Sequence, residues 1–420
     1  MNFKKIFNSN TKYNFSILSG GGNYSKNNSS AASIDTTVNS PTTPKELSSS
    51  IDENLNTMRC IYNTLINSDV VVREFSCHIA KRKYKSFIVY FEGMTDSKIV
   101  NDFLLKPLME IKYDTSYNKN IPLDKYILNT LMPQNNIKTV SSFEEVTSSI
   151  NSGNCILFVD TLNIAFNLDV KSFKQRSVEA SKNETVIRGP HEAFVENIRV
   201  NTSLIRRIIN NENLIIEKTT VGSLSKTNCS ICYIKNIVNP DLISEVKFRI
   251  NNLDVESIES SGQLEQLIEE NGSFGIPQVL TTERPDKCAK ALYQGRVVVL
   301  INGNPYALIM PAVAIDFLSS PEDTNIKSNF ANFLRFLRVV AVFITLLLPG
   351  IYIAITSFHQ EILPTELLFS ILSSREKVPF PVIVELLVME ISFELIREAG
   401  LRIPSPIGAT IRNSWWFNYW

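Results

Sequence analysis

The sequence has no excess of charge of either sign, because its 42 Lys and Arg residues balance its 42 Asp and Glu residues over 420 positions. A chain without surplus cations displaces few phosphate counterions, which argues against general nucleic-acid binding. Histidine is also scarce, with only His78, His191 and His359. Few imidazole side chains are therefore available as a general base for nucleophilic catalysis or as metal ligands. We therefore expect no catalytic residue, no metal and no cofactor.

The cysteine and glycine patterns argue against other classes of protein. The six cysteines are irregularly spaced, unlike the disulfide framework of a small secreted protein. Cys229 and Cys232 have the spacing of a zinc or redox motif, but no second ligand pair follows, and in a strand the two side chains point to opposite faces. The chain has 15 glycines and no P-loop. Its first ten residues lack the apolar run of a secretory signal, which predicts a cytosolic start.

Changes in composition predict five segments. Residues 1–50 hold 11 Ser and 8 Asn, which predicts a disordered tail because little apolar surface offsets the chain entropy. Residues 51–190 and 191–325 are expected to form a first and a second α/β subdomain. Residues 326–411 are expected to form a membrane domain, and residues 412–420 an aromatic-rich tail. The expected fold class is an α/β cytosolic region of two subdomains followed by an α-helical transmembrane domain.

Periodicity places individual elements within the two α/β subdomains. The β-rich runs are Ser86–Phe91, Cys155–Val159, Ser230–Ile234, and a hairpin of Val297–Asn302 with Tyr306–Met310. The helical patterns are Asp52–Ile66, Asp96–Met109, His191–Ile209, Asp241–Asn251, Gly262–Glu270 and Asp286–Tyr293.

One stretch predicts a transmembrane helix. Val339–Phe358 contains 20 residues without a charge, and at 1.5 Å per residue a helix of this length reaches about 30 Å, the thickness of a hydrocarbon core. Its internal Pro349-Gly350 pair is more tolerable in a membrane helix than in a soluble one. The alternative is a buried helix of a soluble protein, but 20 uncharged residues exceed the usual length of such a helix.

The residues that flank this stretch predict its orientation. Arg335 and Arg338 precede the uncharged stretch, whereas His359 and Glu361 follow it. Because positive flanks stay on the cytoplasmic side of a membrane, the N-terminal region is expected in the cytoplasm of an integral membrane protein.

A second apolar stretch, Pro379–Ile396, contains three carboxylates, Glu385, Glu390 and Glu394. A charge at the centre of a bilayer costs about 2.5–3.5 kcal/mol on insertion scales, so contact of all three with lipid is disfavoured. Glu390 and Glu394 are four residues apart and share a helix face. One interpretation is an amphipathic helix at the membrane interface; the other is a helix whose acidic face lines a watery path or a subunit contact.

Many short motifs occur in an order typical of one family. They are Val71–Arg73, Tyr90–Met94, Arg188–Pro190 with Glu192, Thr220–Gly222, Tyr233–Lys235, Gln278–Val279, Thr282–Asp286, Ser320–Asp323, Leu346–Pro349, Phe358–Glu361, Ser374–Glu376, Val378–Pro381 and Phe393–Gly400. From about Leu55 to Ile411, the chain resembles the A subunit of GerA-family spore germinant receptors.

The resemblance implies a place in the spore inner membrane, where nutrients trigger germination. It implies B and C subunits as partners, a homo-oligomer of A subunits around an ion-conducting pore, contact with membrane lipid, and no nucleic-acid partner. Germinant recognition in this family is generally placed on the B subunit, so the resemblance assigns no nutrient pocket here.

The family pattern stops after Ile411, where the family continues into further apolar spans. Here the chain reads Arg412 to Trp420, and these last nine residues hold all three tryptophans. This change predicts a C-terminally truncated or frameshifted chain. Two alternatives to a receptor subunit remain: a membrane-anchored cytosolic enzyme, and a scaffold, each using the cleft between the two α/β subdomains.

Overall fold

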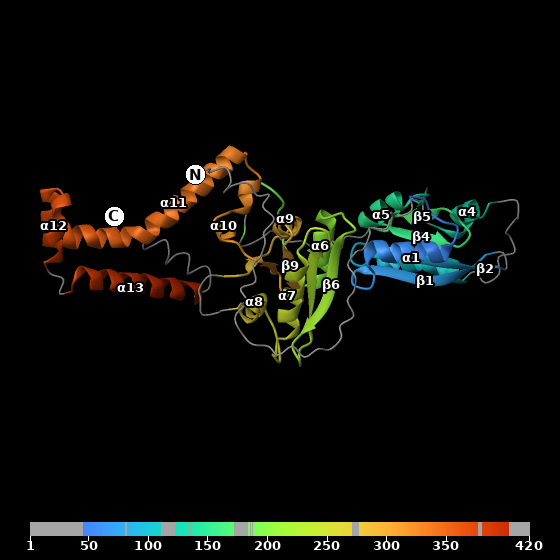
Figure 1. Ribbon diagram of the computed structural model, residues 1–420, viewed down its shortest axis with the longest axis horizontal. Helices are drawn as coiled ribbons and strands as arrows, with labels where there is room; N and C mark the ends of the chain where they lie inside the picture. Colours follow the sequence, from blue (N-terminus) through green and yellow to red (C-terminus); the bar gives the residue numbers. More distant parts are fainter. Residues whose placement is uncertain are drawn as a thin grey trace. The chain divides into compact units, whose positions relative to one another are not determined.

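The computed structural model (Figure 1) describes residues 45–79, 82–110, 122–133, 137–171, 184, 186, 188–270, 277–376 and 380–402. The chain separates into two compact units, residues 1–325 and residues 326–420. The expected tail at residues 1–50 lies, apart from residues 45–50, outside the described residues, and so does the tail at 412–420.

The first α/β subdomain is a five-stranded sheet with helices on both faces. Its neighbouring strands are all antiparallel and lie in the order β1-β2-β4-β5-β3. The strands are β1 (Val70–Ile79), β2 (Arg82–Phe91), β3 (Ile137–Val140), β4 (Cys155–Val159) and β5 (Ala165–Leu168). All five residues of β4 are buried, because both faces of the sheet are covered.

Two hydrophobic cores lie on the two faces of this sheet. On one face, Met58 and Tyr62 of α1 (Ile51–Tyr62) and Val146 of α5 (Phe143–Asn151) pack with Phe87 and Phe91 of β2. The other face packs against short helices that are partly π-helical. They are α2 (Ser97–Val100), η2 (Asn101–Leu105), α3 (Lys106–Glu110), α4 (Leu123–Tyr126) and η3 (Ile127–Leu131).

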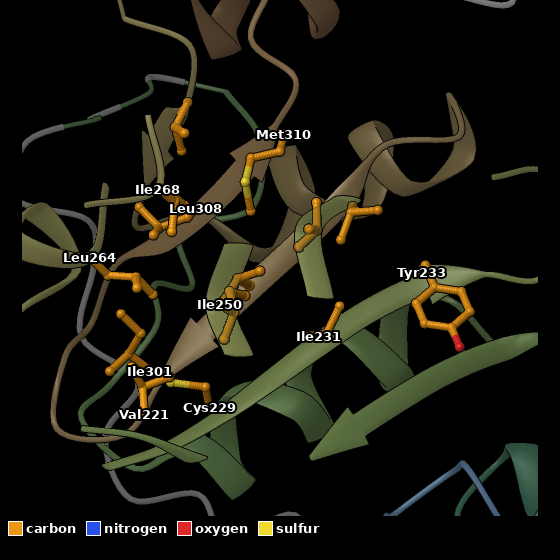
Figure 2. Packing of buried hydrophobic residues seen from close by; sticks show 14 of the residues in the cluster. Val221, Cys229, Ile231, Tyr233, Ile250, Leu264, Ile268, Ile301, Leu308 and Met310 are labelled. Carbon is orange, nitrogen blue, oxygen red and sulfur yellow. The ribbon is translucent and has the colours of Figure 1, made fainter. Parts of the chain in front are cut away.

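The second α/β subdomain has the same architecture. Its antiparallel strands lie in the order β6-β7-β9-β10-β8. The strands are β6 (Leu214–Val221), β7 (Thr227–Ile234), β8 (Leu280–Thr282), β9 (Val297–Ile301) and β10 (Ala307–Met310). One face packs against α7 (Pro240–Asn251) and α8 (Ser261–Ile268), as Figure 2 shows for Ile250, Leu264 and Ile301. The other face packs against α6 (Ile198–Ile208) and α9 (Pro285–Tyr293).

The two subdomains repeat one topology. When the short helices α2 to η3 are grouped as two, each runs helix, two strands, two helices, strand, helix, two strands. When the five strands of each subdomain are counted along the sequence, both sheets have the spatial order first, second, fourth, fifth, third. The α/β region of this chain therefore consists of one α/β topology used twice.

Most predicted elements match the structure, with one correction. The runs at β2, β4 and β7, the β9–β10 hairpin and the helices α1, α7, α8 and α9 are confirmed. The helix predicted over His191–Ile209 is wrong in its first half, because α6 begins only at Ile198. Asn197 caps that helix by accepting a hydrogen bond from the Arg199 amide, and an Asn in this role ends the preceding non-helical chain.

The second unit contains α11 (Ser328–Ile353), the π-helical turn η5 (Ala354–Phe358), η6 (Gln360–Ile362), α12 (Thr365–Arg375) and α13 (Val382–Arg402). Among the described residues, one helix is long and apolar enough to cross a membrane, namely the 31 residues of Ser328–Phe358. It contains the predicted stretch and begins eleven residues before it. Two short helices lie between the α/β region and α11: α10 (Ala314–Phe317) and the 3₁₀ turn η4 (Pro321–Thr324).

Candidate functional site

A short segment after α1 joins the two α/β subdomains. Ser68 donates its backbone N–H to the Ile216 carbonyl at 2.9 Å. The side-chain oxygen of Asn67 accepts a hydrogen bond from the Ile216 amide at 3.1 Å. These bonds satisfy part of the outer edge of β6, which would otherwise present unpaired backbone groups. The segment Asn67–Asp69 therefore lies against the outer edge of β6 at Ile216.

A buried ion pair reinforces this junction. Arg206 of α6 is 1% exposed, and its Nε lies 2.8 Å from Asp69 Oδ2 while Nη2 donates to Asp69 Oδ1 at 3.0 Å. The same guanidinium stacks 4.1 Å from the centre of the Phe91 ring. Burial raises the pKa of Asp69, and the Arg206 charge opposes that rise. We call Asn67, Asp69, Phe91 and Arg206 the interdomain latch.

A polar cleft of about 270 Å³ opens beside the interdomain latch and receives residues from both subdomains. Its lining consists of Ser68, Asp69, Glu92, Asn197, Ile198, Arg199, Thr202, Ile216, Lys218, Asn228, Ser230 and Asn302. Arg199 and Glu92 form an ion pair across it. Gly93 follows Glu92 with φ +93°, a backbone conformation that favours glycine. A Cβ at this position would also lie only 3.2 Å from the Arg199 carbonyl oxygen.

The chemistry of this cleft favours binding over catalysis. Cations, carboxylates and amides in one hollow suit a small polar molecule that carries charges of both signs. The lining contains no histidine and no cysteine, and no cluster of three metal-ligating side chains occurs among the described residues. A hydroxyl such as that of Ser230 therefore has no histidine base within the cleft lining.

The second unit holds the second candidate site, a groove between α11 and α13. Its volume is about 490 Å³, and its lining is Leu348, Pro349, Ile351, Tyr352, Ile355, Leu386, Met389, Glu390 and Phe393. Glu390 supplies the one ionisable carboxylate of this apolar lining. A carboxylate among apolar groups requires water, a cation or a partner to stay ionised.

The structure separates the three predicted glutamates by their surroundings. All three lie on α13, but only Glu390 lines the groove with α11. Glu394 pairs with Arg397 one turn later on the same helix, and Glu385 is half-buried. Of the other predicted residues, Arg335 and Arg338 lie within the first half of α11, and His359 and Glu361 follow the end of the apolar helix.

Comparison with known protein families identifies the family to which this chain belongs. Residues 56–412 match the family model of the Bacillus/Clostridium GerA spore germination protein. The chain belongs to the GerA family. It is 36% identical over 345 residues to spore germination protein KA of Bacillus subtilis (strain 168), covering 82% of this chain and 62% of that protein. It is 39% identical over 325 residues to spore germination protein A1 of the same organism, covering 77% of this chain and 66% of that protein.

A further relative agrees with this family assignment. The GerA-family chain is 34% identical to spore germination protein B1 of Bacillus subtilis (strain 168), over 87% of its own length and 74% of that protein. A crystal structure of the N-terminal domain of the A subunit of the Bacillus megaterium spore germinant receptor GerK3 matches 64% of this chain and 97% of that chain, at 30% identity and a TM-score of 0.48. The chain spans 62% to 74% of the lengths of the three Bacillus subtilis proteins named here.

The structure explains one GerA motif in detail. In Thr282–Asp286, Pro285 is the first residue of α9 and Arg284 is fully buried. The Arg284 guanidinium donates to both carboxylate oxygens of Asp286, at 3.1 and 2.8 Å, and to the carbonyl oxygens of Glu184 and Pro190, at 3.1 and 2.9 Å. A planar guanidinium has enough donors for all four contacts. This motif therefore anchors the distant Arg188–Pro190 motif to the second subdomain.

Sequence patterns suggested a cleft between the two α/β subdomains but missed the residues that form the interdomain latch and line the polar cleft. Asp69 lies in a turn, and Arg206 stands beside Arg207, which is partly exposed and pairs with Glu192. One signal was present: Arg206 falls on the buried stripe of α6, with Thr202 and Ile209 one turn away on either side. A cation at such a position indicates a buried partner.

The cysteines give a probe of membrane topology. Cys229 and Cys232 are buried on opposite faces of β7, as their spacing predicted. Among the six, only Cys60 is exposed, and burial raises the pKa of the Cys155 and Cys288 thiols.

We expect a membrane-impermeant maleimide to label Cys60 only after the membrane is permeabilised, because the positive flank of α11 predicts a cytoplasmic N-terminal region. Gel-shift labelling of protoplasts measures this, and Cys60→Ser is the control that removes the signal. Labelling of intact protoplasts at Cys60 would reverse the predicted orientation.

Proposed function

We propose that this chain is the A subunit of a nutrient germinant receptor of the spore inner membrane, where it helps to form a nutrient-gated ion channel that triggers germination. Membership of the GerA family is the observation that carries the proposal. The apolar helix Ser328–Phe358 supports the membrane placement, and the cations before it support a cytoplasmic N-terminal region. The proposed partners are B and C subunits and further copies of the A subunit.

The channel part of the proposal rests on α13. Its apolar sequence carries Glu385, Glu390 and Glu394, and carboxylates that line a conducting path concentrate cations in it. We propose a membrane domain in which the acidic face of α13 lines a watery path or a subunit contact. The competing interpretation is an amphipathic helix at the membrane interface, which requires only that the acidic face of α13 contacts water.

We expect Glu390→Gln to slow nutrient-triggered potassium release from spores that carry this chain with its companion subunits, at unchanged receptor abundance. The amide keeps the size of the side chain and removes the negative charge that attracts cations. Glu394→Gln is the matched variant on the same face, where Arg397 already neutralises the carboxylate, so we expect a smaller effect. Potassium release is measured with an ion-selective electrode, and abundance by immunoblot. Normal release from the Glu390→Gln spores at normal abundance would remove this glutamate from the conduction path.

The alternative to a receptor subunit is an enzyme that uses the polar cleft. An enzyme needs a nucleophile, a base or a metal set within reach of one reacting atom. Within the described part of the chain, the cleft offers an ion pair, amides and hydroxyls but no such set. These groups support a binding or scaffolding role for the cleft more than a catalytic one.

A further inference from the structure

The segment between β10 and the membrane helix is anchored at both ends and in the middle. We call residues 312–325 the junction segment. At its start, the Ala312 amide donates to the Gln278 carbonyl at 2.8 Å. At its end, the Asn325 side-chain amide donates to the Arg188 carbonyl at 2.8 Å. Only Ile326 and Lys327 separate Asn325 from the first residue of α11.

The central anchor is a buried ion pair. Arg296, immediately before β9, is 4% exposed. Its Nη1 donates to Asp316 Oδ2 at 2.5 Å and its Nη2 to Asp316 Oδ1 at 3.2 Å. Asp316 also accepts the Val313 amide at 3.0 Å, so one carboxylate both caps α10 and fixes it to the sheet. A two-pronged guanidinium–carboxylate contact restricts rotation as well as distance.

The junction segment is also stiff along its length. Ser320 caps η4: its hydroxyl accepts from the Glu322 amide at 3.4 Å, and its own amide donates to Asp323 Oδ2 at 3.0 Å. The Ser320–Asp323 motif is therefore a capping device. Beyond it, Asn325 rests on the Arg188–Pro190 segment, which Arg284 holds through the Pro190 carbonyl. The Cβ of an alanine at position 189 would lie 2.4 Å from Asn325 Nδ2, so this contact requires Gly189.

Three motifs that are distant in the sequence thus converge on the last residues before α11. A flexible linker needs no such contacts, whereas a segment that passes on a change of conformation must be stiff. We propose that the junction segment is a rigid transmission element, in which Arg296, Asp316 and Asn325 are positioning residues that carry the conformation of the second α/β subdomain to the start of α11. This inference rests on the proposed receptor function.

The test inserts Gly-Ser-Gly between Asn325 and Ile326 of the full chain, in spores with the companion subunits. The matched control carries the same insertion after Asn163, an exposed residue of the loop between β4 and β5. Asp316→Asn weakens the central anchor without changing side-chain size. The maximal rate and the half-saturating nutrient concentration of potassium release are measured separately, with abundance followed by immunoblot.

We expect the insertion after Asn325 to lower the maximal rate about 5-fold or more, the range of an ordinary coupling free energy, at an unchanged half-saturating concentration. Asp316→Asn should lower the same rate less, and the insertion after Asn163 should behave as wild type. Wild-type release from the Asn325 insertion spores overturns rigid transmission, and so does a change in half-saturation alone. Absence of release from spores with the unaltered chain would instead contradict the proposed function.

Should an insertion variant fail to accumulate, hydrogen exchange of the purified full chain decides the same question. Rigid transmission requires that the three anchors act as one cooperative unit, so Asp316→Asn should accelerate amide exchange through the junction segment as far as Asn325. Acceleration confined to α10 would show that the segment does not move as one element and would overturn the proposal.

Discussion

Replacing Arg206 by leucine is expected to lower the free energy of unfolding of residues 45–325 by about 3–5 kcal/mol, the usual cost of leaving one buried charge without its partner. Asp69 keeps its burial in this variant but loses the guanidinium that lies 2.8 Å away. The Phe91 ring also loses the cation stacked on it. Urea unfolding followed by circular dichroism measures the change.

The pH dependence of this variant has a definite sign. Burial already raises the pKa of Asp69 in the folded state, and loss of Arg206 raises it further. The folded chain then binds a proton more tightly than the unfolded chain, so the variant regains stability as pH falls through the raised pKa. The stability deficit of Arg206→Leu should accordingly shrink on acidification from neutral pH.

Two further variants separate the interdomain latch from a general charge effect. Arg207→Leu removes the neighbouring, partly exposed arginine and is expected to cost at most about 1 kcal/mol. Asp69→Asn in the Arg206→Leu background removes the unpaired charge and should recover part of the loss. If Arg206→Leu and Arg207→Leu cost the same, the buried pair does not hold the subdomains together.

Much of the α/β region could be predicted because its strands and helices carry local patterns. Five consecutive apolar residues at Cys155–Val159 mark a strand covered on both faces. The Asn239-Pro240 pair marks the start of α7, where Asn239 accepts from the Asp241 amide. The start of α6 was misplaced because Pro190 suggested an earlier helix start, while the Asn197 cap depends on a backbone geometry that periodicity does not show.

The long-range features of the α/β region were not predictable by pattern. The repeated topology of the two subdomains rests on strand order, which involves pairs such as β3 with β5 across intervening elements. The interdomain latch joins residues 137 positions apart, and the junction segment is held by a pair 20 positions apart. Such contacts follow from tertiary packing, and only buried charges within apolar stripes point to them in advance.

The central claim is that nutrients act through this chain to start ion release, so the most direct measurement compares potassium release from spores of the source organism with and without the gene. We expect spores without the chain to lose release in response to at least one nutrient that triggers it in unaltered spores, and expression of the wild-type chain to restore it. The reason is that a receptor channel without its A subunit has neither the apolar helix Ser328–Phe358 nor the carboxylates of α13. Release of unchanged rate and extent for every nutrient to which unaltered spores respond would contradict the account.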